Sequence, residues 1–194
     1  MTKIRSETDT LHRDWSLATN EHGVSVTEFE WGILRFISAF ERSCVQLSRL
    51  ASAEGLKFQE VILVHVVAMQ RGKPTAASLA RQLNRDDVQN LQYSLRKLVE
   101  GNYLLQSKKA GSRVVTYSID TKGQQFVEDY AGIRSKLLAS RTGFIEDIDA
   151  KLSSASQLIG VLTGIYDSAA MVSSTYSPVF GSVENIDGTT DCAE

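Results

Sequence analysis

The sequence predicts a mainly α-helical fold with one small β-hairpin. Only two prolines occur among the 194 residues, which favours long uninterrupted helices over a β-sandwich. Between residues 75 and 119, two helical patterns separated by a short polar break precede two strand-like runs, 103–108 and 113–119. Helix, turn, helix and hairpin follow in this order in a winged helix-turn-helix, so a DNA-binding regulator is the leading hypothesis.

The length and composition indicate a protein of the cytoplasm with a full hydrophobic core. A chain of 194 residues, 42% hydrophobic, suits one or two domains. No apolar run reaches the roughly 18 residues of a membrane span, and residues 1–14 lack the apolar segment of a signal peptide. Cys44 lies in a helical pattern and Cys192 in a polar tail, which fits a reducing compartment better than a disulfide scaffold.

Charge is distributed unevenly along the chain. Residues 71–113 carry nine cations against three carboxylates, a net +6, which leaves −8 for the rest of a chain whose net charge is −2. The cations are Arg71, Lys73, Arg81, Arg85, Arg96, Lys97, Lys108, Lys109 and Arg113. Such asymmetry is typical of one surface that meets a polyanion, although a solvated helical face would have the same composition.

Two helices are predicted before this basic segment. Residues 1–26 have little periodicity and are expected to form an N-terminal arm. A capping box, Thr27-x-x-Glu30, begins an apolar stripe that recurs at three- and four-residue spacing to about Glu54. Because this helix is longer than the core of a small domain requires, part of it is expected to face another subunit. The almost wholly apolar pattern at about 57–70 predicts a central helix.

Capping residues divide the basic segment into its elements. Thr75 is the predicted N-cap of a short helix over 76–83. Asp86 is the predicted cap of the next helix, with Asn84 as the alternative. Asn102 or Gly101 is expected in the left-handed conformation at the end of that helix.

A long helix is predicted after the hairpin, capped by Asp120 or Thr121. Its apolar seam consists of Phe126, Tyr130, Ile133, Leu137, Phe144 and Ile148. Ser153–Ser154 indicates a break, and a last helix follows over about 158–169. The chain then becomes rich in Ser, Gly and Thr, which predicts a disordered tail.

The helix that begins near Asp87 is the candidate for base recognition. Its apolar side has Val88, Leu91, Leu95 and Leu98 facing inward. Gln89, Asn90, Gln92, Tyr93, Arg96 and Lys97 are left on the outer arc. Amides pair with adenine edges in the major groove, and the N-terminal end of a recognition helix enters that groove. Gln89, Asn90 and Gln92 are therefore expected at bases, Tyr93 at a base or phosphate, and Arg96 at phosphate; a polar solvent face is the alternative.

The predicted hairpin tip is cationic. Lys108, Lys109 and Arg113 are expected to contact the DNA backbone or the minor groove, where cations give position rather than sequence choice. Lysines that protect a strand edge from aggregation would give the same pattern.

These residues resemble the MarR family of winged helix transcription regulators over about residues 28–170. The resemblance lies in Leu79-Ala80-x-x-Leu83, Leu91–Leu98, Gly101-Asn102-Tyr103-Leu104, Arg113 and Ile119-Asp120-x-x-Gly123. It implies a homodimeric repressor on a pseudo-palindromic operator, released by a small phenolic or carboxylated effector. The implied organisation is an N-terminal arm (1–26), dimerisation helices (27–56 and 121–172), a winged helix lobe (57–120) and a disordered tail (173–194).

The recognition helix departs from the family pattern. Asn90-Leu91-Gln92-Tyr93 replaces the family's usual Thr-Val-Ser/Thr-Arg, after an apparent one-residue insertion near Asp86–Asp87. Individual base contacts therefore do not carry over from the family, whereas Arg113 does as a wing residue.

No catalytic or cofactor-binding constellation stands out. The three histidines have no metal-ligand spacing, and neither a phosphate loop nor a nucleophile elbow is present. His65 is predicted to be a satisfied core or pocket-lining histidine, with an effector contact as the alternative. Cys44 is predicted to be a packed thiol rather than a redox switch. The sequence therefore predicts neither an enzyme nor a cofactor, metal or membrane partner. A winged helix used as a protein-interaction or dimerisation module is the alternative to DNA binding.

Overall fold

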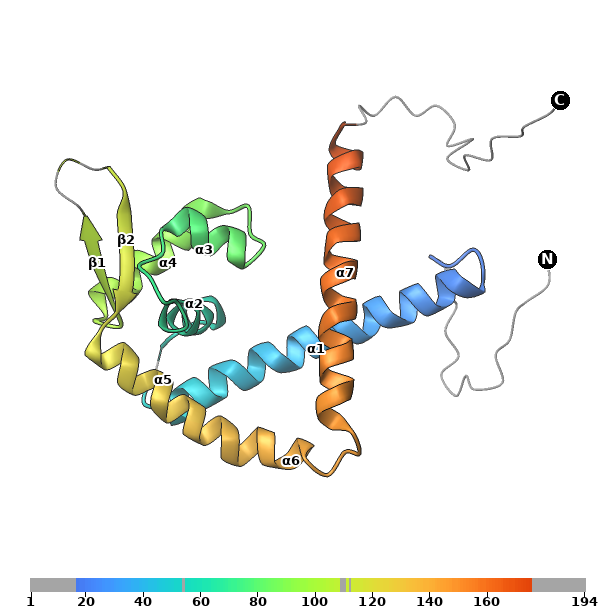
Figure 1. The fold of residues 1–194 in the computed structure, drawn as a ribbon, viewed down its shortest axis with the longest axis horizontal. Coiled ribbons are helices and arrows are strands. Elements are labelled where there is room, and N and C mark those ends of the chain that lie inside the picture. Colours follow the sequence, from blue (N-terminus) through green and yellow to red (C-terminus); the bar gives the residue numbers. More distant parts are fainter. Residues whose placement is uncertain (1–16, 54, 109–110, 112, 176–194) are drawn as a thin grey trace. The chain divides into compact units, whose positions relative to one another are not determined.

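The computed structural model describes residues 17–53, 55–108, 111 and 113–175, and confirms the predicted mainly helical fold with one hairpin (Figure 1). Its contacts divide the chain into two units, residues 1–140 and 141–194. The first contains α1 (Glu21–Leu50), α2 (Phe58–Ala68), α3 (Ala76–Gln82), α4 (Val88–Glu100), β1 (Leu104–Lys108), β2 (Val115–Ile119), α5 (Thr121–Arg134) and η1 (Ser135–Ala139). The short α6 (Ser140–Thr142) crosses the boundary, and α7 (Ile148–Thr175) lies in the second unit. Among the described helices, none is both long and apolar enough to span a bilayer.

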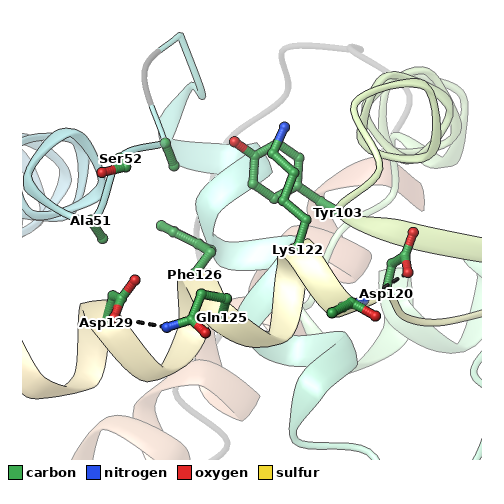
Figure 2. A pocket seen from close by; sticks show the side chains of 10 residues that line it. Ala51, Ser52, Tyr103, Asp120, Lys122, Gln125, Phe126 and Asp129 are labelled. Atoms are coloured by element: carbon green, nitrogen blue, oxygen red, sulfur yellow. Dashed lines mark hydrogen bonds between the residues drawn. The ribbon is translucent and has the colours of Figure 1, made fainter.

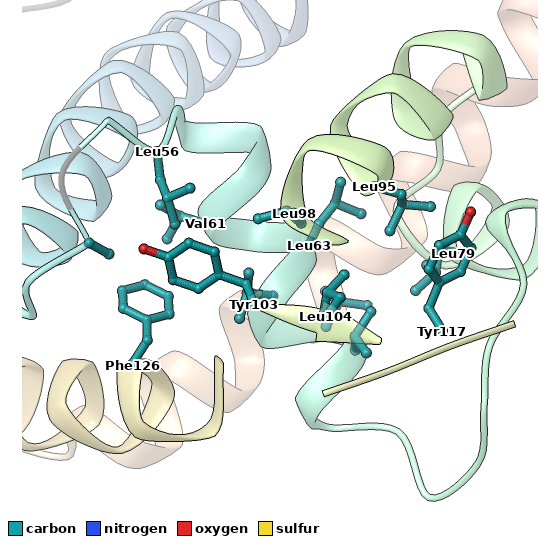
Figure 3. Packing of buried hydrophobic residues seen from close by; sticks show 14 of the residues in the cluster. Leu56, Val61, Leu63, Leu79, Leu95, Leu98, Tyr103, Leu104, Tyr117 and Phe126 are labelled. Atoms are coloured by element: carbon teal, nitrogen blue, oxygen red, sulfur yellow. The ribbon is translucent and has the colours of Figure 1, made fainter. Parts of the chain in front are cut away.

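Helix α2 is central in the first unit, as its apolar sequence predicts. It packs against α1, α3, α4, α5 and β2. Val61, Leu63 and Val64 are fully buried, and they belong to the same core cluster as Leu79 of α3 and Leu95 of α4. Figure 3 shows how this cluster extends from Val61 through Leu63 to Leu79. A helix that is buried on every side has no need of an amphipathic stripe, which explains the unbroken apolar run.

The helix ends in this lobe are fixed by Schellman motifs built on residues other than glycine. Asn102 has a φ of 62°. Its N–H bonds to the Val99 carbonyl, and the Tyr103 N–H to the Leu98 carbonyl. Asn84, with a φ of 50°, ends α3 in the same way. Asn84 is therefore a C-terminal residue of α3 and not the N-cap of α4.

The start of α4 differs from the prediction by one residue. Asp87, rather than Asp86, occupies the N-cap position, and its side chain makes no capping hydrogen bond. By contrast, Thr75 caps α3 as predicted, because its Oγ1 accepts from the Ser78 N–H at 3.1 Å. Asp120 likewise caps α5.

Helix α1 begins earlier than predicted. Asn20 is its N-cap, and the Asn20 side-chain oxygen accepts from the Gly23 N–H at 2.7 Å. Thr27, the predicted start, lies inside the helix and donates its hydroxyl to the Gly23 carbonyl at 2.8 Å. The capping-box pattern was misleading because a threonine in a helix can bond back to a carbonyl one turn earlier. Residues 1–16 of the predicted arm lie outside the described part.

The hairpin pairs residues 104–108 with 115–119 in an antiparallel register, from Leu104 opposite Ile119 to Lys108 opposite Val115. It stands beside α4 (Figure 1). The Tyr117 N–H also bonds to the Pro74 carbonyl at 2.9 Å, which ties β2 to the segment before α3.

The predicted break at Ser153–Ser154 is wrong. The helical run of α5 ends in the π-helical η1 and the single turn α6, and residues 143–147 separate it from α7. Ser154 lies within α7, where its hydroxyl donates to the Ala150 carbonyl at 2.9 Å. Helix α7 continues to Thr175, beyond the predicted start of the tail at residue 173. Residues 176–194 lie outside the described part.

Candidate nucleic-acid interface

Helix α4 presents the side chains that the sequence assigned to base recognition. Its inner side consists of the fully buried Leu91, Leu95 and Leu98. The outer side consists of exposed residues: Gln89, Asn90, Gln92, Tyr93 and Arg96. Tyr93 has 64% of its surface exposed, which is high for an aromatic residue. The structure thus brings these five side chains to one surface, and their contact with DNA stays a prediction.

A hydrogen-bonded cluster stands at the start of α4. The guanidinium of Arg85 donates to both carboxylate oxygens of Asp87, at 2.8 and 2.5 Å. The Asn90 amide also donates to Asp87, at 3.3 Å, and Arg85 reaches the side chain of Gln59 on α2 at 3.5 Å. The Arg85 hydrogen bond holds the pKa of Asp87 below its ordinary value. Sequence reasoning missed this cluster, although an arginine two residues before an aspartate was a visible signal.

Lys97 is partly exposed on α4 and has an ion-pair partner on α2 that the sequence did not predict. Its Nζ lies 2.8 and 2.9 Å from the two carboxylate oxygens of Glu60, which is 3% exposed. Glu60 also accepts the Lys57 N–H at the start of α2. This ion pair joins the recognition helix to the central helix, although the Lys97 side chain is still 40% exposed.

The wing adds cations beside α4. Lys108 at the end of β1 and Arg113 before β2 are both exposed. Lys109 lies outside the described residues. Tyr117 faces inward, and its burial raises the pKa of its hydroxyl while the nearby charge of Arg96 opposes that rise. Arg96 therefore lies close to the hairpin as well as on the outer face of α4.

A shallow pocket of about 680 Å³ lies behind the wing, where the end of α1 meets the start of α5 (Figure 2). Its apolar surface comes from Tyr103 and Phe126, whose rings are 5.9 Å apart in an edge contact. Lys122 lies over the Tyr103 ring at 4.2 Å and donates to the Gly101 carbonyl at 2.9 Å. Asp129 accepts from Gln125 at 3.1 Å. The pocket therefore combines aromatic surface with polar groups that already have partners within the chain.

His65 lies beside this region, half-buried and packed against the core, and only one of its two ring nitrogens is satisfied within the described residues. Its ring meets Tyr130 at 4.4 Å and Phe126 at 5.4 Å, and its Nδ1 bonds to the Val61 carbonyl at 2.7 Å. Its Nε2 is buried without a hydrogen-bond partner in the described structure. Burial lowers the pKa of His65, the Val61 bond opposes that shift, and the charge of Arg134 adds to it.

Cys44 is a packed thiol in the described structure, 2% exposed. Burial and a hydrogen bond with Cys44 raise the pKa of Tyr130 well above its ordinary value. Tyr130 therefore keeps its proton at neutral pH, and both side chains are part of the buried core.

Comparisons with known proteins agree with this geometry. Residues 56–123 match the family model of the winged helix DNA-binding domain. A solved MarR family transcription regulator has a TM-score of 0.60 at 12% identity, and the match covers 78% of this chain and 99% of that one.

Two further similar structures hold DNA. FabT of Streptococcus pneumoniae in complex with DNA has a TM-score of 0.56 at 14% identity, over 74% of this chain and 96% of that one. The MepR–DNA complex of S. aureus has a TM-score of 0.53 at 19% identity, over 69% and 94%. A search of curated proteins found no match. The chain therefore has the fold of the MarR family of winged helix transcription regulators.

Proposed function

We propose that this protein is a sequence-specific transcription regulator of the MarR type, a repressor that binds duplex DNA as a homodimer on a pseudo-palindromic operator. The observation that carries the proposal is the exposed amide-rich face of α4 beside the cationic hairpin of a winged helix DNA-binding domain. Amides on a helix that fits the major groove suit base edges, and cations beside that helix suit phosphates. The similar structures solved with DNA support the same partner.

The contacts divide by chemistry. We assign to base edges the residues Gln89, Asn90, Gln92 and Tyr93. We assign to phosphates or the minor groove the residues Arg96, Lys108, Lys109 and Arg113. The first set should decide which sequence is bound, whereas the second should set affinity and its dependence on salt.

Exposed apolar faces support the homodimer. Trp31, Leu34, Phe36, Ile37 and Phe40 of α1 are each at least 42% exposed, and α7 exposes Leu158, Val161, Ile165 and Tyr166. Large apolar side chains repeated along a helix are typical of a surface that a partner covers. A second copy of the chain is the occupant that a two-half-site operator requires, because each recognition helix reads one major groove. Light scattering at micromolar concentration should give twice the monomer mass, and a monomer would rule out this arrangement.

The last part of the proposal is that a small aromatic ligand releases the protein from DNA. The pocket beside Tyr103 and Phe126 offers aromatic surface between the end of α1 and the start of α5. A ligand that binds the native state raises the unfolding temperature, so a thermal-shift screen with small aromatic acids tests this part by itself.

Selection from a pool of randomised duplexes tests DNA binding without knowledge of the operator. The wild type should enrich a sequence with two related halves about one helical turn apart. Gln92→Ala should enrich a different sequence. Arg113→Ala should enrich the same one but bind every duplex more weakly, with a salt slope shallower by about 0.9. Absence of any enrichment and of any gel shift at low salt would refute DNA binding and favour a protein-docking role.

A further inference from the structure

The carboxylate of Asp87 has an unusual position for a residue at the start of a recognition helix. It occupies the N-cap position of α4, yet its oxygens accept from the side chains of Arg85 and Asn90 rather than from the helix backbone. Its side chain is 43% exposed, whereas that of Arg85 is 20% exposed. The negative partner of this ion pair is therefore the one that faces outward beside the proposed base-reading residues.

The ion pair with Asp87 keeps the guanidinium of Arg85 from contacting DNA. Arg85 lies where α3 turns into α4, and an unpaired guanidinium there could reach a phosphate and add affinity for any sequence. Asp87 holds that guanidinium with two hydrogen bonds, and the Nη2 that donates to Asp87 also donates to the side chain of Gln59 on α2 at 3.5 Å. The pair is neutral as a unit, and its exposed carboxylate repels phosphate.

The same carboxylate orients an amide. Asn90 donates one of its two amide hydrogens to Asp87. The other hydrogen and the amide oxygen remain for the bidentate pattern that adenine presents through N7 and N6. An amide fixed in one orientation also distinguishes bases better than one that can rotate to suit any edge.

We propose that Asp87 is a specificity-determining residue: it lowers affinity for all DNA by holding Arg85 and sharpens base choice by orienting Asn90. The inference rests on the proposed function, because it requires α4 to read duplex DNA.

Asp87→Asn and Asp86→Asn form a matched pair for the test. Both remove one negative charge at adjacent exposed positions, but only the first removes the ion pair with Arg85 and one of the two oxygens that accept from it. Fluorescence anisotropy would measure binding to two probes over a range of salt concentrations. One probe is a pool of random duplexes of about 20 base pairs, long enough for two half-sites, and the other is the sequence that the wild type selects from it.

Asp87→Asn should bind the random pool about eightfold more tightly at about 0.1 M salt, with a slope steeper by about 0.9, the value of one new phosphate contact. Its preference for the selected sequence should fall. Asp86→Asn should keep the wild-type slope and preference, and Arg85→Gln combined with Asp87→Asn should lose the gain.

If Asp87→Asn behaves like Asp86→Asn, or keeps its gain without Arg85, the role of Asp87 is refuted while DNA binding stands. If the wild type binds neither probe at low salt, the proposed function itself fails. Circular dichroism of each variant confirms that the helices are intact.

Discussion

Gly123 in the first turn of α5 gives the sharpest stability prediction. A Cβ at this position would lie 2.1 Å from the carbonyl oxygen of Tyr103 and 2.7 Å from Cδ1 of Ile119. The Tyr103 oxygen is backbone and already accepts the Asp120 N–H at 3.1 Å. The Ile119 side chain can rotate, but the Tyr103 backbone oxygen cannot avoid the new methyl by a rotamer change, so Gly123→Ala must push the start of α5 away from the turn before β1.

The expected change in the free energy of unfolding has three contributions. Forcing a methyl into a filled space costs about 1–3 kcal/mol. Loss of the hydrogen bond between Asp120 and Tyr103 costs about 1 kcal/mol more. Replacing glycine by alanine within a helix returns up to about 1 kcal/mol. We therefore expect Gly123→Ala to lower the free energy of unfolding by about 1–4 kcal/mol.

Gly132, near the other end of α5, is the matched control. A Cβ there meets nothing within 4 Å, so Gly132→Ala should raise the free energy of unfolding by about 1 kcal/mol. Urea unfolding followed by circular dichroism, at one fixed protein concentration, measures both variants. A Gly123→Ala variant as stable as Gly132→Ala would refute the close approach of α5 to Tyr103.

Three further perturbations test other parts of the structure. Lys97→Met leaves the carboxylate of Glu60 buried without its ion-pair partner, and urea unfolding should show a free energy of unfolding lower by about 2 kcal/mol. The loss is smaller than for a fully buried pair because the lysine is partly exposed, and an unchanged midpoint would contradict the pairing. The pKa of His65 is lower in the folded than in the unfolded chain, so protonation favours the unfolded chain and the free energy of unfolding should fall as the pH drops below about 6.5. His65→Gln should lack this pH-dependent fall, and equal pH profiles of variant and wild type would contradict the prediction. Phe36→Asp changes a side chain that is 63% exposed and should shift light scattering toward the monomer mass with the helix content intact, whereas an unaltered mass would remove α1 from the dimer interface.

Local signals predicted most of the lobe correctly. The Thr75 cap, the apolar spacing of α4 and the left-handed Asn102 each depend on neighbours within a few residues, which a sequence displays directly. The long apolar run likewise predicted the central position of α2, because a helix buried on all sides needs no polar face.

The errors arise where two patterns compete or where distant residues meet. Thr27 fits a capping box, but Asn20 provides an earlier cap, and the hydroxyl of Thr27 bonds inside the helix instead. Lys97 reads as a surface cation, since its partner Glu60 is 37 residues away and on another helix. The Arg85–Asp87 pair was within reach of sequence reasoning, yet adjacent polar residues in a turn have too many possible partners for the sequence to choose among them.

The π-helical turn η1 changes how this chain should be compared with others. A helix advances about 100° per residue, and a π-helical turn accommodates one residue more than a regular turn. Relative to a regular α-helix, the side chains after residues 135–139 are therefore rotated by about a quarter of a turn from those before them. The apolar seam that the three- and four-residue spacing predicts from Phe126 through Leu137 thus does not stay on one face of the helix. An alignment that allows one extra residue there would restore the phase, so a single-residue gap against a relative at this point need not alter either end of the helix.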